Sequence, residues 1–341
     1  MGNRQGKIIM EYKRLLWADS LKGWLIILVV LGHSIQHVLG IDSEANHIWN
    51  IIYSFHMPAF MAVSGYLAYR PANSGSNYNV LSSIFRRFRQ LVIPFFLWTL
   101  ILLSLYGKLS INAVEEYIIY PDNGLWFLLV LFFISTIFIL VSKVGEKAKL
   151  KHDYIVAFMC LFLTLVEIVF KLRILGFQFI AYYFLFYALG FFIHKCEKKI
   201  ITKNSSIIFL LLIIWLVLAW FWKMHELPFY TMVLPYSIML YLYRFITAVI
   251  AVYLLFVISP RLLNGNTTFN NAIGHLGCIS LGIYTTHVII MGRVVHFVNE
   301  MVTNTSLLIL ISFFVSLLVS YFVVWVLNRW SITKKILLGK I

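Results

Sequence analysis

The sequence predicts an all-α polytopic membrane protein, a bundle of about ten transmembrane helices with both termini in the cytoplasm. Its 341 residues are 61% hydrophobic and only 12% charged, whereas soluble domains have roughly 45–50% apolar and about 25% charged residues. Apolar runs that approach the ~20 residues needed to cross a bilayer recur along the whole chain. This composition excludes an ordinary soluble enzyme and a disordered chain.

The apolar runs predict ten spans within one membrane domain that covers residues 1–341. The predicted spans are residues 22–40, 48–69, 88–106, 124–142, 154–170, 176–194, 206–222, 236–258, 278–298 and 305–327. Between the seventh and eighth spans, Pro228 and Pro235 indicate an interfacial or re-entrant segment.

The basic residues test this topology. A formal net charge of +15 would point to nucleic acid in a soluble protein. Here 21 of the 28 Lys and Arg residues fall in segments predicted to be cytoplasmic, and only four fall in the opposite loops. That asymmetry is the positive-inside pattern of membrane proteins. We therefore expect the lipid bilayer as the partner, and no nucleic acid.

The first span carries the most informative pair of ionisable residues. Lys22 lies at its cytoplasmic end, and His33 follows eleven positions later. Eleven residues are three helical turns, so both side chains share one helix face, about 16 Å apart along the axis. An ionisable group inside a bilayer is costly and marks a functional candidate. Alternatively, His33 has a structural role, in which its imidazole forms a hydrogen bond to a neighbouring helix. Asp19 either caps this helix or pairs with Lys22 on the same face.

Further polar groups lie within other spans. In the second span, His56 is next to Pro58, which breaks or kinks a helix and indicates a cavity wall; a kinked packing helix is the alternative. Gly65 in the same span permits close approach of a neighbouring helix. The ninth span contains His287, with Tyr284 about one turn before it.

The remaining candidates have simpler explanations. Trp126 at the start of the fourth span is compatible with an aromatic belt at the membrane surface. Glu167 lies near the outer end of the fifth span, where its carboxylate can reach water. Arg244 lies within the eighth span and has no obvious partner nearby in the sequence.

Arginines precede the third span. Arg86 and Arg89 are three positions apart and face the same way on a helix, whereas Arg87 points elsewhere. One explanation of these arginines is the positive-inside pattern alone. The other is that they bind a phosphorylated ligand such as a coenzyme A thioester, because the guanidinium fork matches phosphate oxygens.

Five segments together resemble the integral-membrane acyltransferase family 3. They are DSLKGWLIILVVLGHS, FHMPAFMAVSGYL, RRFRQLVIPFFLW, LWFLLVLF and SLGIYTTHVI, and they occur in the family's order over most of the chain. The first two are most similar to the branch described as fucose 4-O-acetylase-like. Many members have arginine where this chain has Lys22, which keeps the charge but removes the bidentate fork.

The resemblance implies a multi-pass enzyme of the bacterial inner or plasma membrane. Such an enzyme transfers an acyl group, commonly acetyl, from cytoplasmic acyl-CoA to a hydroxyl of a sugar or surface-glycan precursor; the sequence leaves acetyl and a longer chain open. His33 is then the general base or a transient acyl carrier, and the sequence does not choose between these routes. No metal is expected. Beside His33 the expected site residues are Asp19 and His56 (catalytic), Lys22, Arg86 and Arg89 (acetyl-CoA), and His287, Tyr284, Trp126 and Glu167 (acceptor).

A transporter or flippase for a glycan or small metabolite is the competing hypothesis. Intramembrane histidines and a basic inner face also suit proton-coupled transport. The sequence shows no internal repeat, which weakens that hypothesis because many transporters are built from inverted repeats.

Overall fold

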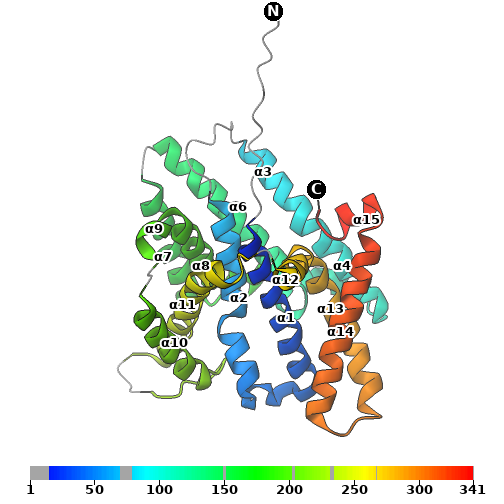
Figure 1. Cartoon of the computed structure of the whole chain (residues 1–341). Helices are drawn as coiled ribbons and strands as arrows, with labels where there is room; N and C mark the ends of the chain where they lie inside the picture. Colours follow the sequence, from blue (N-terminus) through cyan, green and yellow to red (C-terminus); the bar gives the residue numbers. More distant parts are fainter. Residues whose placement is uncertain are drawn as a thin grey trace, which may run out of the picture.

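The computed structural model describes residues 15–69, 79–148, 151–201, 204–230, 234–265 and 267–340, and this part of the chain contains helices and no strand (Figure 1). Nine of its helices are long and apolar enough to cross a membrane, and α10 (Ser205–Trp220) is apolar but shorter, at 16 residues. The predicted all-α polytopic membrane protein is confirmed, with α10 at the position of the predicted seventh span.

The other long helices follow the predicted spans closely. They are α1 (Leu16–Leu39), α2 (His47–Ala68), α6 (Trp126–Ala148), α7 (His152–Phe170), α8 (Phe177–Lys195), α11 (Tyr236–Leu262), α13 (Ser280–Asn299) and α14 (Thr305–Leu327). The third span is composite: α3 (Val80–Arg87), the π-helical η2 (Phe88–Val92) and α4 (Ile93–Leu105). Short elements connect them: η1 (Gly40–Ala45), α5 (Ile111–Ile119), η3 (Pro121–Asn123), η4 (Ile174–Gly176), α9 (Glu197–Ile200), α12 (Thr268–Cys278) and α15 (Ser331–Ile336).

Two local predictions on α1 and α2 need correction. α1 begins six residues before the predicted start, because the apolar residues upstream of Asp19 already form its first turn. Its N-cap is Leu15, without a side-chain capping bond, so Asp19 does not cap the helix. α2 continues through Pro58, so of the break or kink predicted there the break does not occur; neighbouring helices bury most of this helix.

The two N-terminal helices form the centre of the bundle (Figure 1). α1 packs against α2, α12, α13 and α14, and α2 packs against α8 and α11. Glycines allow the closest approach of α2 and α8. A Cβ atom on Gly65 would lie 1.9 Å from the carbonyl oxygen of Tyr187, and one on Gly190 would lie 1.8 Å from that of Ala62. The predicted close approach at Gly65 is confirmed.

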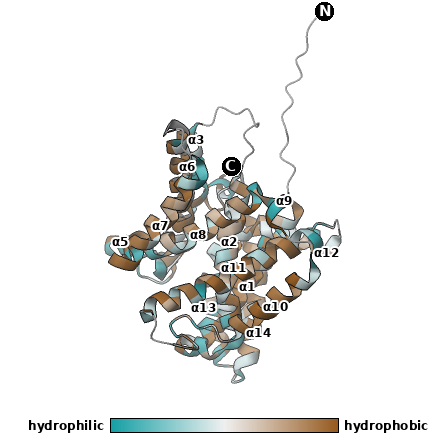
Figure 2. Ribbon diagram, turned by 90° about the vertical axis from the view of Figure 1, so that its left-hand side faces the viewer, coloured by the Kyte–Doolittle hydropathy of each residue, from teal (hydrophilic) through white to brown (hydrophobic). Residues whose placement is uncertain are grey.

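Peripheral helices present hydrophobic side chains outward. Large exposed residues recur on α7, α10 and α14, for example Phe158, Phe209 and Leu318, and hydrophobic residues colour most of α10 (Figure 2). In water such a surface would be unfavourable, whereas lipid solvates it. The peripheral helices therefore have the surface expected of lipid-facing segments.

Candidate functional site

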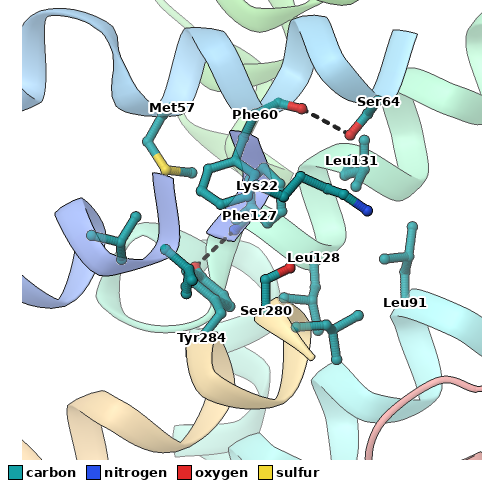
Figure 3. A pocket seen from close by; sticks show the side chains of 13 residues that line it. Lys22, Met57, Phe60, Ser64, Leu91, Phe127, Leu128, Leu131, Ser280 and Tyr284 are labelled. Atoms are coloured by element: carbon teal, nitrogen blue, oxygen red, sulfur yellow. Dashed lines mark hydrogen bonds between the residues drawn. The ribbon is translucent and has the colours of Figure 1, made fainter. Parts of the chain in front are cut away.

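Among the cavities of the described part of the chain, two share lining residues, and the first of these is small and mostly apolar. It has a volume of about 150 Å³. Its lining residues come from α1, α2, η2, α6 and α13, and they are Lys22, Ile26, Val29, Met57, Phe60, Ser64, Leu91, Phe127, Leu128, Leu131, Ser280, Leu281 and Tyr284 (Figure 3). We call it the small cavity.

The second cavity is larger and more polar, with a volume of about 480 Å³. Its lining residues are Val29, His33, Tyr53, His56, Met57, Asp122, Trp126, Glu167, Arg173, Gln178, Phe179, Tyr182, Tyr183, Met224, His225, Tyr241, Arg244 and Tyr284. We call it the large cavity. Its volume lies within the range of small-molecule sites, roughly 300–1,000 Å³.

The two cavities meet at three shared residues, Val29, Met57 and Tyr284, which we call the junction. α1 runs along both cavities and presents Lys22 and Val29 to the small one, and Val29 and His33 to the large one. These positions are seven and four residues apart, which keeps them on one helix face. The predicted common face of Lys22 and His33 is confirmed.

His33 is the first residue of a chain of hydrogen bonds. Its Nδ1 lies 2.9 Å from Nε2 of His287, and Nδ1 of His287 lies 3.0 Å from the carbonyl oxygen of Ile283. A carbonyl only accepts, so Nδ1 of His287 is the donor, and Nε2 of a neutral His287 is an acceptor. His33 must then donate from Nδ1. In the neutral tautomer, this leaves Nε2 of His33 unprotonated.

Two further predicted residues, His56 and Tyr284, line the large cavity, and each forms a hydrogen bond to a backbone group. Nδ1 of His56 donates to the carbonyl oxygen of Ile52 at 2.7 Å, so the other nitrogen of a neutral His56 is an acceptor. The hydroxyl of Tyr284 accepts from the backbone N–H of Phe127 at 3.3 Å, as Figure 3 shows. The Tyr284 hydroxyl hydrogen therefore remains available as a donor at the junction.

Lys22 is the cation of the small cavity. Its ammonium forms an ion pair with Asp19 at 2.7 Å, and its side chain retains 23% exposure. The predicted pairing of these two residues is thus confirmed. Figure 3 shows the side chain directed to the part of the cavity where Ser64, Leu91 and Leu131 lie. Lys22 can therefore meet a charged group that enters at this end.

Aromatic rings form one wall of the large cavity. Trp126 stacks on Phe179 with ring centroids 4.6 Å apart, and on Tyr183 at 5.3 Å. Glu167 and Arg173 line the same cavity and interact electrostatically. Flat aromatic faces beside charged and amide groups are suited to a ligand with both apolar and hydroxyl-bearing faces.

The structure thus gathers most of the predicted site residues, with some exceptions. His33, His56, Tyr284, Trp126 and Glu167 line the large cavity. His287 is fully buried beside His33 and lines neither cavity.

The predicted arginines line neither cavity. Arg86 is at the end of α3 and Arg89 is in η2, where its guanidinium lies 5.9 Å from the ring centre of Phe85. Neither arginine lines the small cavity, whereas Leu91 of the same π-helical segment does.

Several lining residues were not predicted, above all Tyr53, Phe179, Tyr182 and Tyr183. The aromatic cluster of the sixth span, FQFIAYYF, is a signal for the last three, but such a cluster is equally typical of helix packing. Tyr53 lies on α2, outside that cluster. As to metals, no group of three or more His, Cys, Asp or Glu side chains is positioned to hold an ion within the part of the chain that the structure describes.

The fold and the histidine site agree with a membrane-embedded acyltransferase. The model of acyltransferase family 3, described as an acyltransferase domain, matches residues 15–325, and this chain belongs to that family. Family membership identifies its class as an acyltransferase enzyme.

Two curated relatives carry one name, nodulation protein NolL. The chain is 44% identical over 87 residues to the protein of Sinorhizobium fredii, which covers 24% of this chain and 22% of that protein. It is 35% identical over 92 residues to the protein of Mesorhizobium japonicum, which covers 26% of this chain and 23% of that protein. The matches thus span less than a quarter of either relative. No solved structure matches this chain.

Proposed function

We propose that the protein transfers an acetyl group from cytoplasmic acetyl-CoA to a hydroxyl of a sugar or surface-glycan precursor, as in the fucose 4-O-acetylase-like branch. It does so in the inner or plasma membrane of a bacterial cell. One observation carries the proposal: His33 lies beside the junction of two cavities of different chemistry. Two substrates can therefore approach this histidine, each through its own cavity.

The small cavity suits the donor. Its lining is apolar except for Lys22 and a few hydroxyl groups, which matches the thioester and the thin arm of coenzyme A. Lys22 lies at the end where basic residues predict the cytoplasm, and it attracts the phosphates. Arg86 and Arg89 add positive charge on the approach to this end.

The large cavity suits the acceptor. Trp126 and Tyr183 offer flat faces for the apolar side of a sugar ring, while Glu167 and Gln178 offer hydrogen bonds for its hydroxyls. His56 accepts a hydrogen bond from a hydroxyl rather than donating one, because its donor nitrogen is bound to Ile52.

Of the two routes, we propose direct transfer. Nε2 of His33 takes the proton from the acceptor hydroxyl, whose oxygen attacks the thioester carbonyl carbon. The hydroxyl of Tyr284 donates to the carbonyl oxygen as negative charge develops on it. The carbon–sulfur bond then breaks, the His33 proton passes to the thiolate, and the products are the acetyl ester and free coenzyme A.

Two of the expected site residues act through others. His287 fixes the tautomer and orientation of His33, which makes it a positioning residue rather than an acceptor ligand. Asp19 precedes His33 by fourteen residues, about 21 Å along the helix axis. Asp19 therefore positions Lys22 and does not touch the reacting atoms.

Purified protein with acetyl-CoA labelled in the acetyl group tests this function. We expect release of coenzyme A that depends on a sugar acceptor and yields a labelled ester. The protein itself remains unlabelled, because transfer is direct. Label on His33 would replace direct transfer with the acyl-histidine route. Movement of a glycan across vesicle membranes without thioester consumption would favour the transporter and contradict the proposal.

Lys22→Gln is expected to raise the KM for acetyl-CoA about tenfold and to change kcat little, since one charge-assisted contact to phosphate is lost. Initial rates at varied acetyl-CoA measure this. The effect should disappear with S-acetylpantetheine, which has the thioester and the arm but no nucleotide phosphates.

Lys171→Gln is the matched control, because Lys171 is exposed, follows α7 and lines neither cavity. An equal rise in KM for both donors in Lys22→Gln would show that Lys22 shapes the cavity rather than binding phosphate.

A further inference from the structure

The large cavity contains an arginine, Arg244, that has no role in the proposed transfer chemistry. Arg244 lies on α11 eight residues after its start at Tyr236, about 12 Å along the helix axis. It lines the large cavity together with His33. A guanidinium at this depth of a membrane helix is costly unless it serves a pathway or a ligand.

The contacts of Arg244 satisfy only part of its hydrogen-bonding capacity. Its guanidinium lies 5.6 Å from the ring centre of Tyr182 and 5.8 Å from that of Trp222. Nη1 reaches the carbonyl oxygen of Met224 at 3.5 Å. Nε is buried and has no hydrogen-bond partner. Two aromatic faces hold the guanidinium in place, and most of its donors remain for another group.

The carboxylates of the same cavity do not neutralise Arg244. Across the described residues, no Asp or Glu side chain forms an ion pair with it. Glu167 is electrostatically linked to Arg173 instead, and Tyr241 lies near both Glu167 and Arg244. Arg244 is half-buried, and a partly desolvated cation without a carboxylate partner favours an anion from outside the protein.

We propose that Arg244 binds an anionic group of the acceptor, a carboxylate or a phosphate, while an acceptor hydroxyl lies at His33. The acceptor class is then an acidic sugar or a sugar phosphate rather than a neutral glycan. This inference rests on the proposed function only in naming the bound anion as part of the acceptor. The planar fork of Arg244 matches both anions bidentately.

Anion binding can be tested without acyl transfer. The indole of Trp222 faces Arg244, so its fluorescence reports on the guanidinium. Purified protein is titrated with inorganic phosphate and with glucuronate. We expect a saturable change in fluorescence that is absent in Trp222→Phe, about 10- to 100-fold weaker in Arg244→Gln, and intermediate in Arg244→Lys, which keeps the charge but not the fork.

Arg293→Gln is the matched control. Arg293 also lies in a membrane helix and contacts one carbonyl oxygen, that of Leu105, at 3.4 Å, but it lines neither cavity. The Arg293→Gln variant should bind phosphate and glucuronate as the unmodified protein does. Glu167→Gln tests whether Glu167 neutralises Arg244: binding of phosphate by that variant alone would overturn the inference. So would equal binding by Arg244→Gln and the unmodified protein.

Acceptor pairs that differ only in charge identify the bound group. Transfer from acetyl-CoA is compared for methyl glucuronoside against methyl glucoside, and for glucose 1-phosphate against methyl glucoside, with galactose and mannose analogues beside them. We expect kcat/KM at least tenfold higher for one charged member, and loss of this preference through KM in Arg244→Gln. The two arms distinguish carboxylate from phosphate.

The outcomes separate the two proposals. Equal transfer to charged and neutral acceptors overturns the role of Arg244 and leaves the acetyltransferase intact. Anion binding that depends on Arg244, without transfer to any acceptor, keeps the anion site and counts against the proposed function. Size-exclusion profiles and melting temperatures of all variants establish that they fold.

Discussion

Replacing His33 with alanine is expected to lower kcat for acetyl transfer by about 10²- to 10⁴-fold, the range that a positioned general base contributes. The reason is geometric. His33 is the histidine beside the junction whose free nitrogen can take a proton from the acceptor, because its other nitrogen donates to His287. Initial rates of coenzyme A release in the presence of a saturating acceptor measure the loss.

The matched control is His296→Ala, which removes an exposed histidine from α13 that lines neither cavity. It should retain full activity. The melting temperature of His33→Ala should stay close to that of the unmodified protein, because its side chain is only half-buried and forms the wall of a cavity. Substantial transfer by folded His33→Ala protein would remove His33 from the mechanism.

Replacing His287 with phenylalanine is expected to lower kcat by about 10²-fold or more, although His287 lines neither cavity. Phenylalanine fills the buried space but cannot accept the hydrogen bond from His33. The His33 proton is then free to move to the nitrogen that should act as the base, as in a triad whose orienting residue is lost. His287→Gln should recover part of the activity, because its amide oxygen can replace the accepting nitrogen.

A purely structural role for His287 predicts a different pattern. In that case Phe and Gln would differ only in stability, and both melting temperatures would track the loss of activity. A double variant provides a second readout. In a His33→Ala background, His287→Phe should lower activity no further, because the two residues act as one unit. Additive losses would show that His287 acts independently of His33.

Much of the fold could be predicted from the sequence because lipid imposes a simple rule. A segment of about 20 apolar residues must form a helix to satisfy its backbone groups. α14 (Thr305–Leu327) matches its predicted span residue for residue. Among the largest errors in the predicted boundaries are the starts of the first and third spans, where the helix begins several residues earlier, at Leu16 of α1 and Val80 of α3. Amphipathic turns at the membrane surface have no such length constraint.

Part of the site could also be predicted. The three-turn spacing placed Lys22 and His33 on one face, because a helix fixes the angle between positions. The intramembrane cost of ionisable groups selected His56 and His287. Their roles could not be derived, since the hydrogen bond between His33 and His287 joins residues 254 positions apart. The same holds for Arg244, whose aromatic partners lie on α8 and in the segment that follows α10.

The sequence by itself determined that this protein is a helical membrane bundle with a cation and a histidine along one wall of its first helix. These are local properties, set by hydropathy, charge and the helical repeat. Only the tertiary structure decided that two cavities meet at Val29, Met57 and Tyr284, and which ring nitrogen of His33 is free. It also decided that Arg244 forms no ion pair with a carboxylate of the described residues. Cavities and long-range hydrogen bonds depend on the packing of helices distant in sequence, for which no local pattern codes.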